Sequence, residues 1–179
     1  MNIQKKYEMM VEDIGYFLNS YSYEFDAYLD LDNWNVVPCS SSCGEQAHFY
    51  PEEGHRILRI EQLPSVDNYN AMRDFVDIVE DEPTREKLTK ALANAHPFRR
   101  FKTLVLNDNL LRPLWYNHLH KVQRNQALHW LDEHQVTLDG ERLVSPQAFE
   151  FRFTDFFCDD LIDNELFNHD DEDDEFSDF

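Results

Sequence analysis

Hydrophobic positions divide the chain into a helical start, an extended middle and a long helical second half. In residues 3–19 the apolar side chains follow the i, i+3, i+4, i+7 spacing of one buried helix face. Residues 21–31 instead alternate apolar with mostly polar side chains, which is the periodicity of a strand. A polar turn at 32–35, a return strand from Val36-Val37, a polar loop over 39–54 and a strand at 56–60 complete this part.

Helical spacing dominates after residue 64. Helices are predicted over 66–80 with Ser65 as the cap, over 83–94 with Pro83 in the first turn, and from Pro97 onward. A longer helix is predicted over 109–135, followed by a hairpin turn at Asp139-Gly140. Leu128 and Leu131 lie outside the main apolar stripe of the long helix, so that helix either kinks or is buried on two sides.

These elements predict an α+β fold, with a small antiparallel sheet near the N-terminal third packed against four or five helices. Residues 1–154 are expected to form a single domain. Residues 155–179 form an acidic C-terminal appendage, in which 156–167 could be a docking helix and the last part is expected to be disordered.

Charge changes the picture of possible partners. The net charge is −20, and residues 155–179 hold 12 acidic residues and no Lys or Arg, which leaves −8 on the rest of the chain. Such a surface repels nucleic acids and anionic membranes on average. The sequence has no apolar run long enough to span a membrane, no signal-peptide pattern and three cysteines without a disulfide framework, so we expect a cytoplasmic protein.

The segment Phe98-Arg99-Arg100-Phe101-Lys102 resembles the signature of UPF0158, a family of uncharacterised bacterial proteins. Other segments resemble the family in the same order, over about residues 25–138. They are Tyr28-Leu29-Asp30-Leu31, Leu63-Pro64 with Tyr69, Met72 and Phe75, and Trp115-Tyr116 with Ala127, Trp130 and Leu131. The family usually has glycines around the positions of Asn94 and His96 and a small residue at Pro97. The resemblance implies a bacterial, cytoplasmic, globular protein and no particular activity.

The first candidate site is this Phe-Arg-Arg-Phe-Lys segment. Arg99, Arg100 and Lys102, with His96 just before them, stand at the start of a predicted helix, where amide N–H groups and the helix dipole favour an anion. Arginines bind phosphate or carboxylate groups with two hydrogen bonds. The alternative is that the arginines pair with nearby carboxylates while the two phenylalanines belong to the core.

Histidines and cysteines supply weaker candidates. Cys39, Cys43, His48 and His55 are ligands that zinc prefers, although their spacing is not that of a standard zinc site. His96, His118 and His129 could each serve a metal-assisted hydrolase together with nearby carboxylates. His118 and His129 are about 16 Å apart along a helix, too far for one metal ion. The sequence contains no nucleophile motif and no phosphate-binding glycine-rich loop, and it gives no reason to expect a cofactor.

The function class expected first is a binding or interaction protein, with an anion or an acidic partner held at the Phe-Arg-Arg-Phe-Lys segment. A protein partner fits this expectation better than nucleic acid does. The acidic run at 170–175 could bind a basic partner, hold divalent cations loosely or cover the Arg99–Arg100 patch within the same chain. The metal-assisted hydrolase is the alternative function, and a structural role in oligomers is a third. The oligomeric state itself stays open.

Overall fold

The computed structural model describes residues 2–20, 25–40 and 50–152. Five helices occur in these residues, namely α1 (Ile3–Leu18), α2 (Ser65–Ile78), α3 (Glu82–Ala93), α4 (Pro97–Leu106) and α5 (Leu111–Glu133). Six strands accompany them, namely β1 (Phe25–Asp30), β2 (Asn35–Ser40), β3 (Arg56–Ile60), β4 (Thr137–Asp139), β5 (Arg142–Val144) and β6 (Phe149–Glu150). The α+β prediction is confirmed.

The main sheet is antiparallel and has the strand order β2-β1-β3-β6. Leu29 of β1 lies between Val36 of β2 and Leu58 of β3, so the two-residue alternation of β1 sends its leucine to the covered face. Tyr28 points to the opposite face, where it joins a smaller cluster with Ile57. A separate hairpin of β4 and β5 turns at Gly140, as predicted, where a positive φ of 63° suits glycine.

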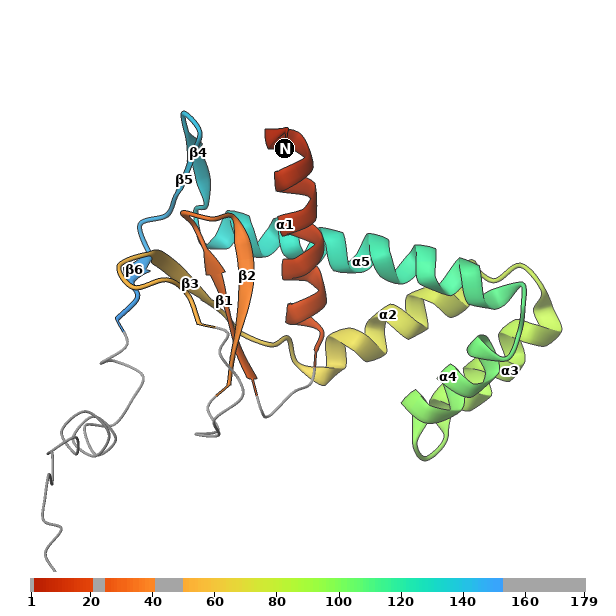
Figure 1. Ribbon diagram of the computed structural model, residues 1–179. Coiled ribbons are helices and arrows are strands. Elements are labelled where there is room, and N and C mark those ends of the chain that lie inside the picture. Colours follow the sequence, from red (N-terminus) through yellow and green to blue (C-terminus); the bar gives the residue numbers. More distant parts are fainter. Residues whose placement is uncertain (1, 21–24, 41–49, 153–179) are drawn as a thin grey trace, which may run out of the picture.

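Two hydrophobic cores lie at opposite ends of α5 (Figure 1). The first core is formed by one sheet face, α1 and the C-terminal half of α5. The second is formed by α2, α3, α4 and the N-terminal half of α5. Trp115 of α5 belongs to the helical core, whereas Trp130 and Leu131 belong to the sheet core.

Burial on two sides therefore explains the broken apolar stripe of the long helix, which runs as a single helix from Leu111 to Glu133. Leu131 is buried in the sheet core, although Leu128 remains 36% exposed. Two local expectations need correction. Ser65 does not cap α2 but is its first residue, preceded by Pro64 at the N-cap position. The sheet also gains a fourth strand, β6, from residues that carried no strand pattern.

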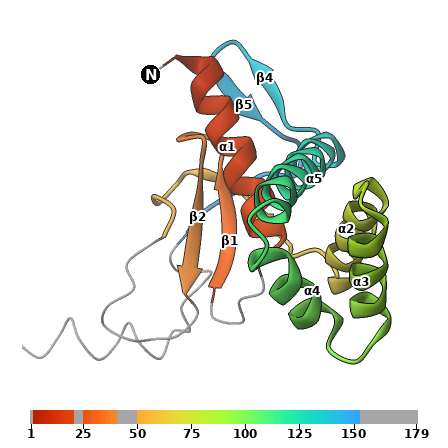
Figure 2. The ribbon, with the colours of Figure 1, turned by 90° about the vertical axis from the view of Figure 1, so that its right-hand side faces the viewer.

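The crossing of α1 and α5 depends on Gly15. The two helices cross at a steep angle in both views (Figures 1 and 2). A Cβ atom on Gly15 would lie 2.7 Å from the carbonyl oxygen of Gln123, which is backbone and cannot rotate away. One turn further on, Asn19 donates a hydrogen bond of 2.8 Å to the Gln126 side chain. Only glycine allows the backbones to approach this closely.

We expect Gly15→Ala to destabilise the protein by about 2 kcal/mol, because the added methyl group forces the two helices apart in a packed core. Urea unfolding measures this loss. Lys5→Ala, at an exposed position of the same helix, is the matched control and should change stability by less than about 0.5 kcal/mol. Equal stability of Gly15→Ala and the control would contradict the close crossing.

Candidate functional site

The candidate site is built by α3, the turn at residues 94–96 and α4. Asp81 starts α3 by accepting a hydrogen bond of 3.0 Å from the backbone N–H of Thr84, so the helix has a conventional side-chain cap. Pro97 then starts α4 in its first turn, where the missing N–H costs nothing. The short turn sends α4 back against α3, at the end of the molecule remote from the sheet (Figures 1 and 2).

The Phe-Arg-Arg-Phe-Lys segment divides between core and solvent because of its helical spacing. Phe101 is fully buried, with its ring 6.0 Å from that of Phe75 and 5.0 Å from that of Trp115. Edge-to-face contacts of this kind fix the rotation of α4 about its own axis. Arg99 and Arg100 consequently lie on the exposed side of the helix.

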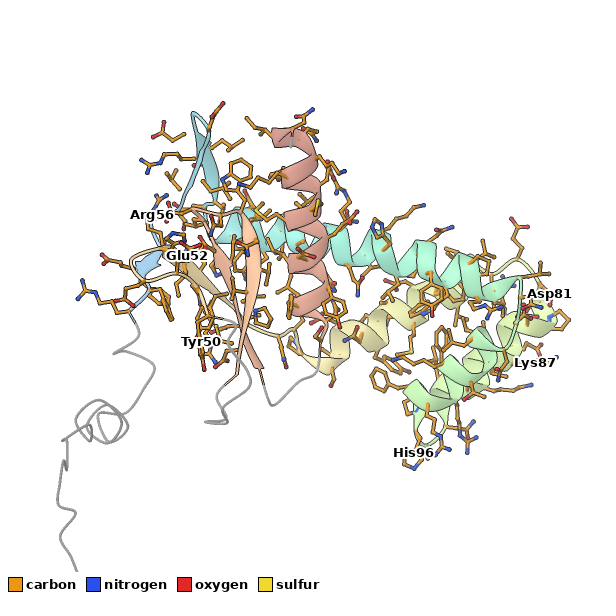
Figure 3. The ribbon with its side chains drawn as sticks, viewed as in Figure 1. Tyr50, Glu52, Arg56, Asp81, Lys87 and His96 are labelled. Atoms are coloured by element: carbon orange, nitrogen blue, oxygen red, sulfur yellow. The ribbon has the colours of Figure 1, made fainter. Side chains whose placement is uncertain are left out.

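A groove of about 610 Å³ lies between the exposed sides of α3 and α4. Its lining residues are Lys87, Lys90, Ala91, Asn94, His96, Arg99, Arg100, Thr103 and Leu104. The structure therefore brings together three of the four residues predicted for an anion site, His96, Arg99 and Arg100. Lys102 is exposed on the same helix but does not line the groove. Figure 3 labels Lys87 and His96 at this end of the molecule.

The two arginines of the groove have no carboxylate partner among the residues that the structure describes, whereas both lysines lie near acidic side chains. The charge of Lys87 contributes, after the hydrogen bonds from Thr84, to the lowered pKa of Asp81. Among the described residues, no Asp or Glu lines the groove, and Arg99, Arg100 and Lys87 make no ion pair. Lys90 approaches Glu86 at 3.4 Å in a solvent-exposed pair, an arrangement of small energetic value. The alternative that the arginines are neutralised by neighbouring carboxylates therefore has no support in this part of the chain.

Charge is strongly segregated along the sequence. Residues 83–107, which span α3 and α4 almost completely, hold six Lys or Arg and one Glu, a balance of +5. The remaining 154 residues hold 10 basic and 35 acidic residues, a balance of −25. Lys87 and Lys90 are the charged groove residues that sequence reasoning missed. Their i, i+3 spacing on the helix before the arginines was the available signal, because it places both on one face.

His96 occupies an unusual backbone conformation at the mouth of the groove. Its φ of 57° and ψ of 53° lie in the left-handed region, where a residue with a side chain pays about 1 kcal/mol or more relative to glycine. No side chain caps the first turn of α4. The N–H groups of that turn thus lack a side-chain partner beside an exposed imidazole and two arginines.

A second polar cluster lies at the other end of the molecule, around the turn between β1 and β2. Asp30 is only 1% exposed, and its Oδ1 accepts hydrogen bonds from the backbone N–H groups of Asp32 and Asn33. Its Oδ2 lies 2.8 Å from Nδ1 of His55, at the start of β3. This cluster ties the β1–β2 turn to the neighbouring strand. Figure 3 labels Glu52 and Arg56 beside it.

Three side chains of this cluster are spaced closely enough to be considered as a metal-binding site. Ligand atoms of Asp30, Asp32 and His55 all lie within 4.8 Å of one another. Asp32, however, accepts hydrogen bonds from both the backbone N–H and the guanidinium of Arg56, at 2.8 and 2.6 Å. A metal ion at Asp32 would have to displace the guanidinium group of Arg56. The contacts instead identify a structural clamp that satisfies a buried carboxylate.

The cysteines and histidines predicted as weak zinc candidates do not converge where they are described. Cys39 pairs with Asp26 in the β-ladder, four residues from Asp30 and its partner His55, or about 13 Å along the strand. Burial raises the pKa of the Cys39 thiol to about 12, assisted by the charge of Asp26, so the thiol stays protonated at neutral pH. Cys43 and His48 lie outside the described residues.

The histidines of the alternative hydrolase are dispersed as well. His118 is half-buried, and its Nε2 lies 2.9 Å from the backbone oxygen of Ala71 in α2, so it links two helices. His129 is exposed and pairs with Glu133 at 3.3 Å, one turn further along α5. His96 belongs to the groove on the other side of the helical core. These three side chains therefore do not assemble a common site.

The Asp30–His55 contact predicts a pH dependence of stability. The hydrogen bond to Asp30 raises the pKa of His55, with smaller contributions from the nearby charges of Asp30, Glu52 and Asp32. The folded state therefore binds this proton more tightly than the unfolded state does. The resulting stabilisation is complete below pH about 6.5 and is lost as the pH rises through the raised pKa.

His55→Gln should remove this dependence and lower stability most at acidic pH, by about 1.5–3 kcal/mol, the usual contribution of a hydrogen bond to a charged group. Urea unfolding of both proteins between pH 5.5 and about 8.5 isolates the effect, since other histidines cancel in the difference. A difference that stays constant, or grows with rising pH, would contradict the assignment.

Comparisons with known proteins place the chain in a family. The profile of the uncharacterised protein family UPF0158 matches residues 9–150, which include both cores and the groove. The UPF0158 protein PA5073 of Pseudomonas aeruginosa is similar, with 29% identity over 113 residues, 62% of this chain and 74% of that protein. No solved structure matches the chain significantly. The chain belongs to the uncharacterised protein family UPF0158.

Proposed function

We propose that this protein is a cytoplasmic binding protein that takes an anionic ligand, or an acidic partner surface, into the groove between α3 and α4. One observation carries the proposal. Four cationic side chains, Lys87, Lys90, Arg99 and Arg100, converge on one groove that no described carboxylate lines. Folding like charges together costs free energy through mutual repulsion. A bound anion offsets that cost and gives the arrangement a use.

The surroundings of the groove favour binding over catalysis. The described acidic residues closest in sequence to the cations, Glu82 and Glu86, do not line the groove, so no carboxylate stands beside His96 as a catalytic partner. Thr103 donates its hydroxyl proton to the backbone oxygen of Arg99 and is not activated by a neighbouring base. No observation in the described residues favours the metal-assisted hydrolase, and we propose no second function.

Membrane attachment through a spanning helix finds no support in the structure. No helix among the described residues combines the length and the apolar character that crossing a bilayer requires. Even α5, with 23 residues, carries charged and polar side chains along its whole length.

Retention on phosphocellulose, a resin that carries phosphate groups, tests the proposal in the full-length protein. A protein with a net charge of −20 should pass through such a resin unless a local site binds phosphate. We expect retention of the wild type at about 0.05 M salt, where screening is weak, and elution as salt rises. Arg99→Ala/Arg100→Ala should pass through.

Arg73→Ala/Lys102→Ala is the matched control, because it removes the same charge from two exposed positions outside the groove. This variant should be retained like the wild type. Passage of the wild type, or equal retention of both double variants, would reject the groove as an anion site. Unfolding curves confirm that each variant is folded, which we expect because all four side chains are exposed.

A further inference from the structure

The chemistry of the groove narrows the class of its ligand. The cations form two walls, with Lys87 and Lys90 on α3 and the arginines on α4. Lys87 and Lys90 are three residues apart, so their attachment points are separated by about 4.5 Å along the helix axis. A single carboxylate or phosphate group contacts one part of such a site and leaves the other cations unpaired. Full pairing requires a ligand with several charges distributed along its length.

Neutral recognition groups are few in the groove. Among the described residues, no Phe, Tyr or Trp side chain lines the groove, so the imidazole of His96 is the one ring there on which a nucleobase could stack. Asn94 and Thr103 line the groove, but their side chains donate hydrogen bonds to backbone carbonyls of their own helices. Ala91 and Leu104 supply a small apolar surface. The site therefore selects charge and leaves little for reading a base or a sugar.

Acidic surroundings limit the size of the ligand. Asp81 and Glu82 stand exposed at the first residues of α3, the end opposite to His96 (Figure 3). Outside residues 83–107, the described residues hold 10 basic and 21 acidic residues, a balance of −11. A long polyanion, such as a nucleic acid duplex or an acidic protein surface, would extend from the groove into this repulsive field. A volume of about 610 Å³ suits a small molecule.

We propose that the ligand of the groove is a short linear oligophosphate, either free or as the phosphate chain of a nucleotide. This inference rests on the proposed function and narrows it. The guanidinium groups of Arg99 and Arg100 bind phosphate oxygens in pairs, as planar forks do, and Lys87 and Lys90 neutralise the neighbouring phosphates as point charges. The first turn of α4, which no side chain caps, begins beside His96, and helix N-termini favour an anion.

Calorimetric titration of the full-length protein tests this class. The titrants are orthophosphate, pyrophosphate, tripolyphosphate and ATP, at a constant ionic strength of about 0.1 M. We expect the affinity to rise with each added phosphate, by a factor of about 10 or more from orthophosphate to tripolyphosphate. ATP binding equal to tripolyphosphate indicates a site for the phosphate chain alone, and tighter ATP binding identifies a nucleotide as its source. Both outcomes support the inference.

Variants assign the binding to the groove. Arg99→Ala/Arg100→Ala and Lys87→Ala/Lys90→Ala should each weaken tripolyphosphate binding by a factor of about 10 or more, since each removes one cationic wall. Arg73→Ala/Lys102→Ala should leave it unchanged. If only Arg99→Ala/Arg100→Ala lost affinity, the proposal that the ligand is held between both walls would be wrong.

Binding of other polyanions, compared with binding of tripolyphosphate, can contradict the inference. A hexa-aspartate peptide or a DNA duplex that binds more tightly than tripolyphosphate at the same salt would overturn the inference in favour of an acidic protein or a nucleic acid. An affinity that does not rise with phosphate number would also overturn it. If phosphocellulose retention depends on Arg99 and Arg100 while tripolyphosphate fails to bind, the anion site stands and the oligophosphate assignment falls.

Discussion

The long helix α5 is the element on which the rest of the structure depends, because its two halves are buried in two different cores. Trp115 is packed among the helices, and Ala127 and Trp130 are packed against the sheet. Most of the free energy that holds each core together comes from burial of apolar surface. A break in α5 would separate the two cores. The close passage of Gly15 over Gln123 fixes where α1 crosses this helix.

The position of the groove follows from that constraint. Trp115 presents its ring to Phe101 at 5.0 Å and to Phe75 at 5.3 Å, so the N-terminal half of α5 orients α4 through an aromatic cluster. Once Phe101 points inward, helical geometry turns Arg99 and Arg100 outward. The cationic groove is thus a consequence of core packing on one side of α4. The exposed side of α4, which carries Arg99 and Arg100, takes no part in either core.

Periodicity in the sequence was sufficient to predict the fold class and nearly all helices. The spacing of Tyr7, Met10 and Ile14 identifies α1 without reference to any neighbour. The position of Leu131 outside the main stripe of α5 predicts either a kink or burial on two sides, and the structure shows burial on two sides. Strand β6 could not be predicted, because two residues carry no period and pair with β3 only through tertiary contact.

The candidate site was predictable only where its residues are neighbours in the sequence. Arg99 and Arg100 are adjacent in the sequence, so their cluster is visible there, whereas Lys87 and Lys90 join them only because the turn at 94–96 reverses the chain. Asp30 and His55 are 25 residues apart, and their contact depends on the register of β1 with β3. Local patterns contain no information on such register.

The most direct test of the central claim, a short oligophosphate bound between α3 and α4, is amide hydrogen exchange of the full-length protein with and without tripolyphosphate. The account predicts slower exchange in the segment 94–104, where the turn and the first residues of α4 surround the ligand, and unchanged exchange in the β1–β2 turn at 30–33. Protection centred on Asp30 and His55, or no protection in α4, would contradict it.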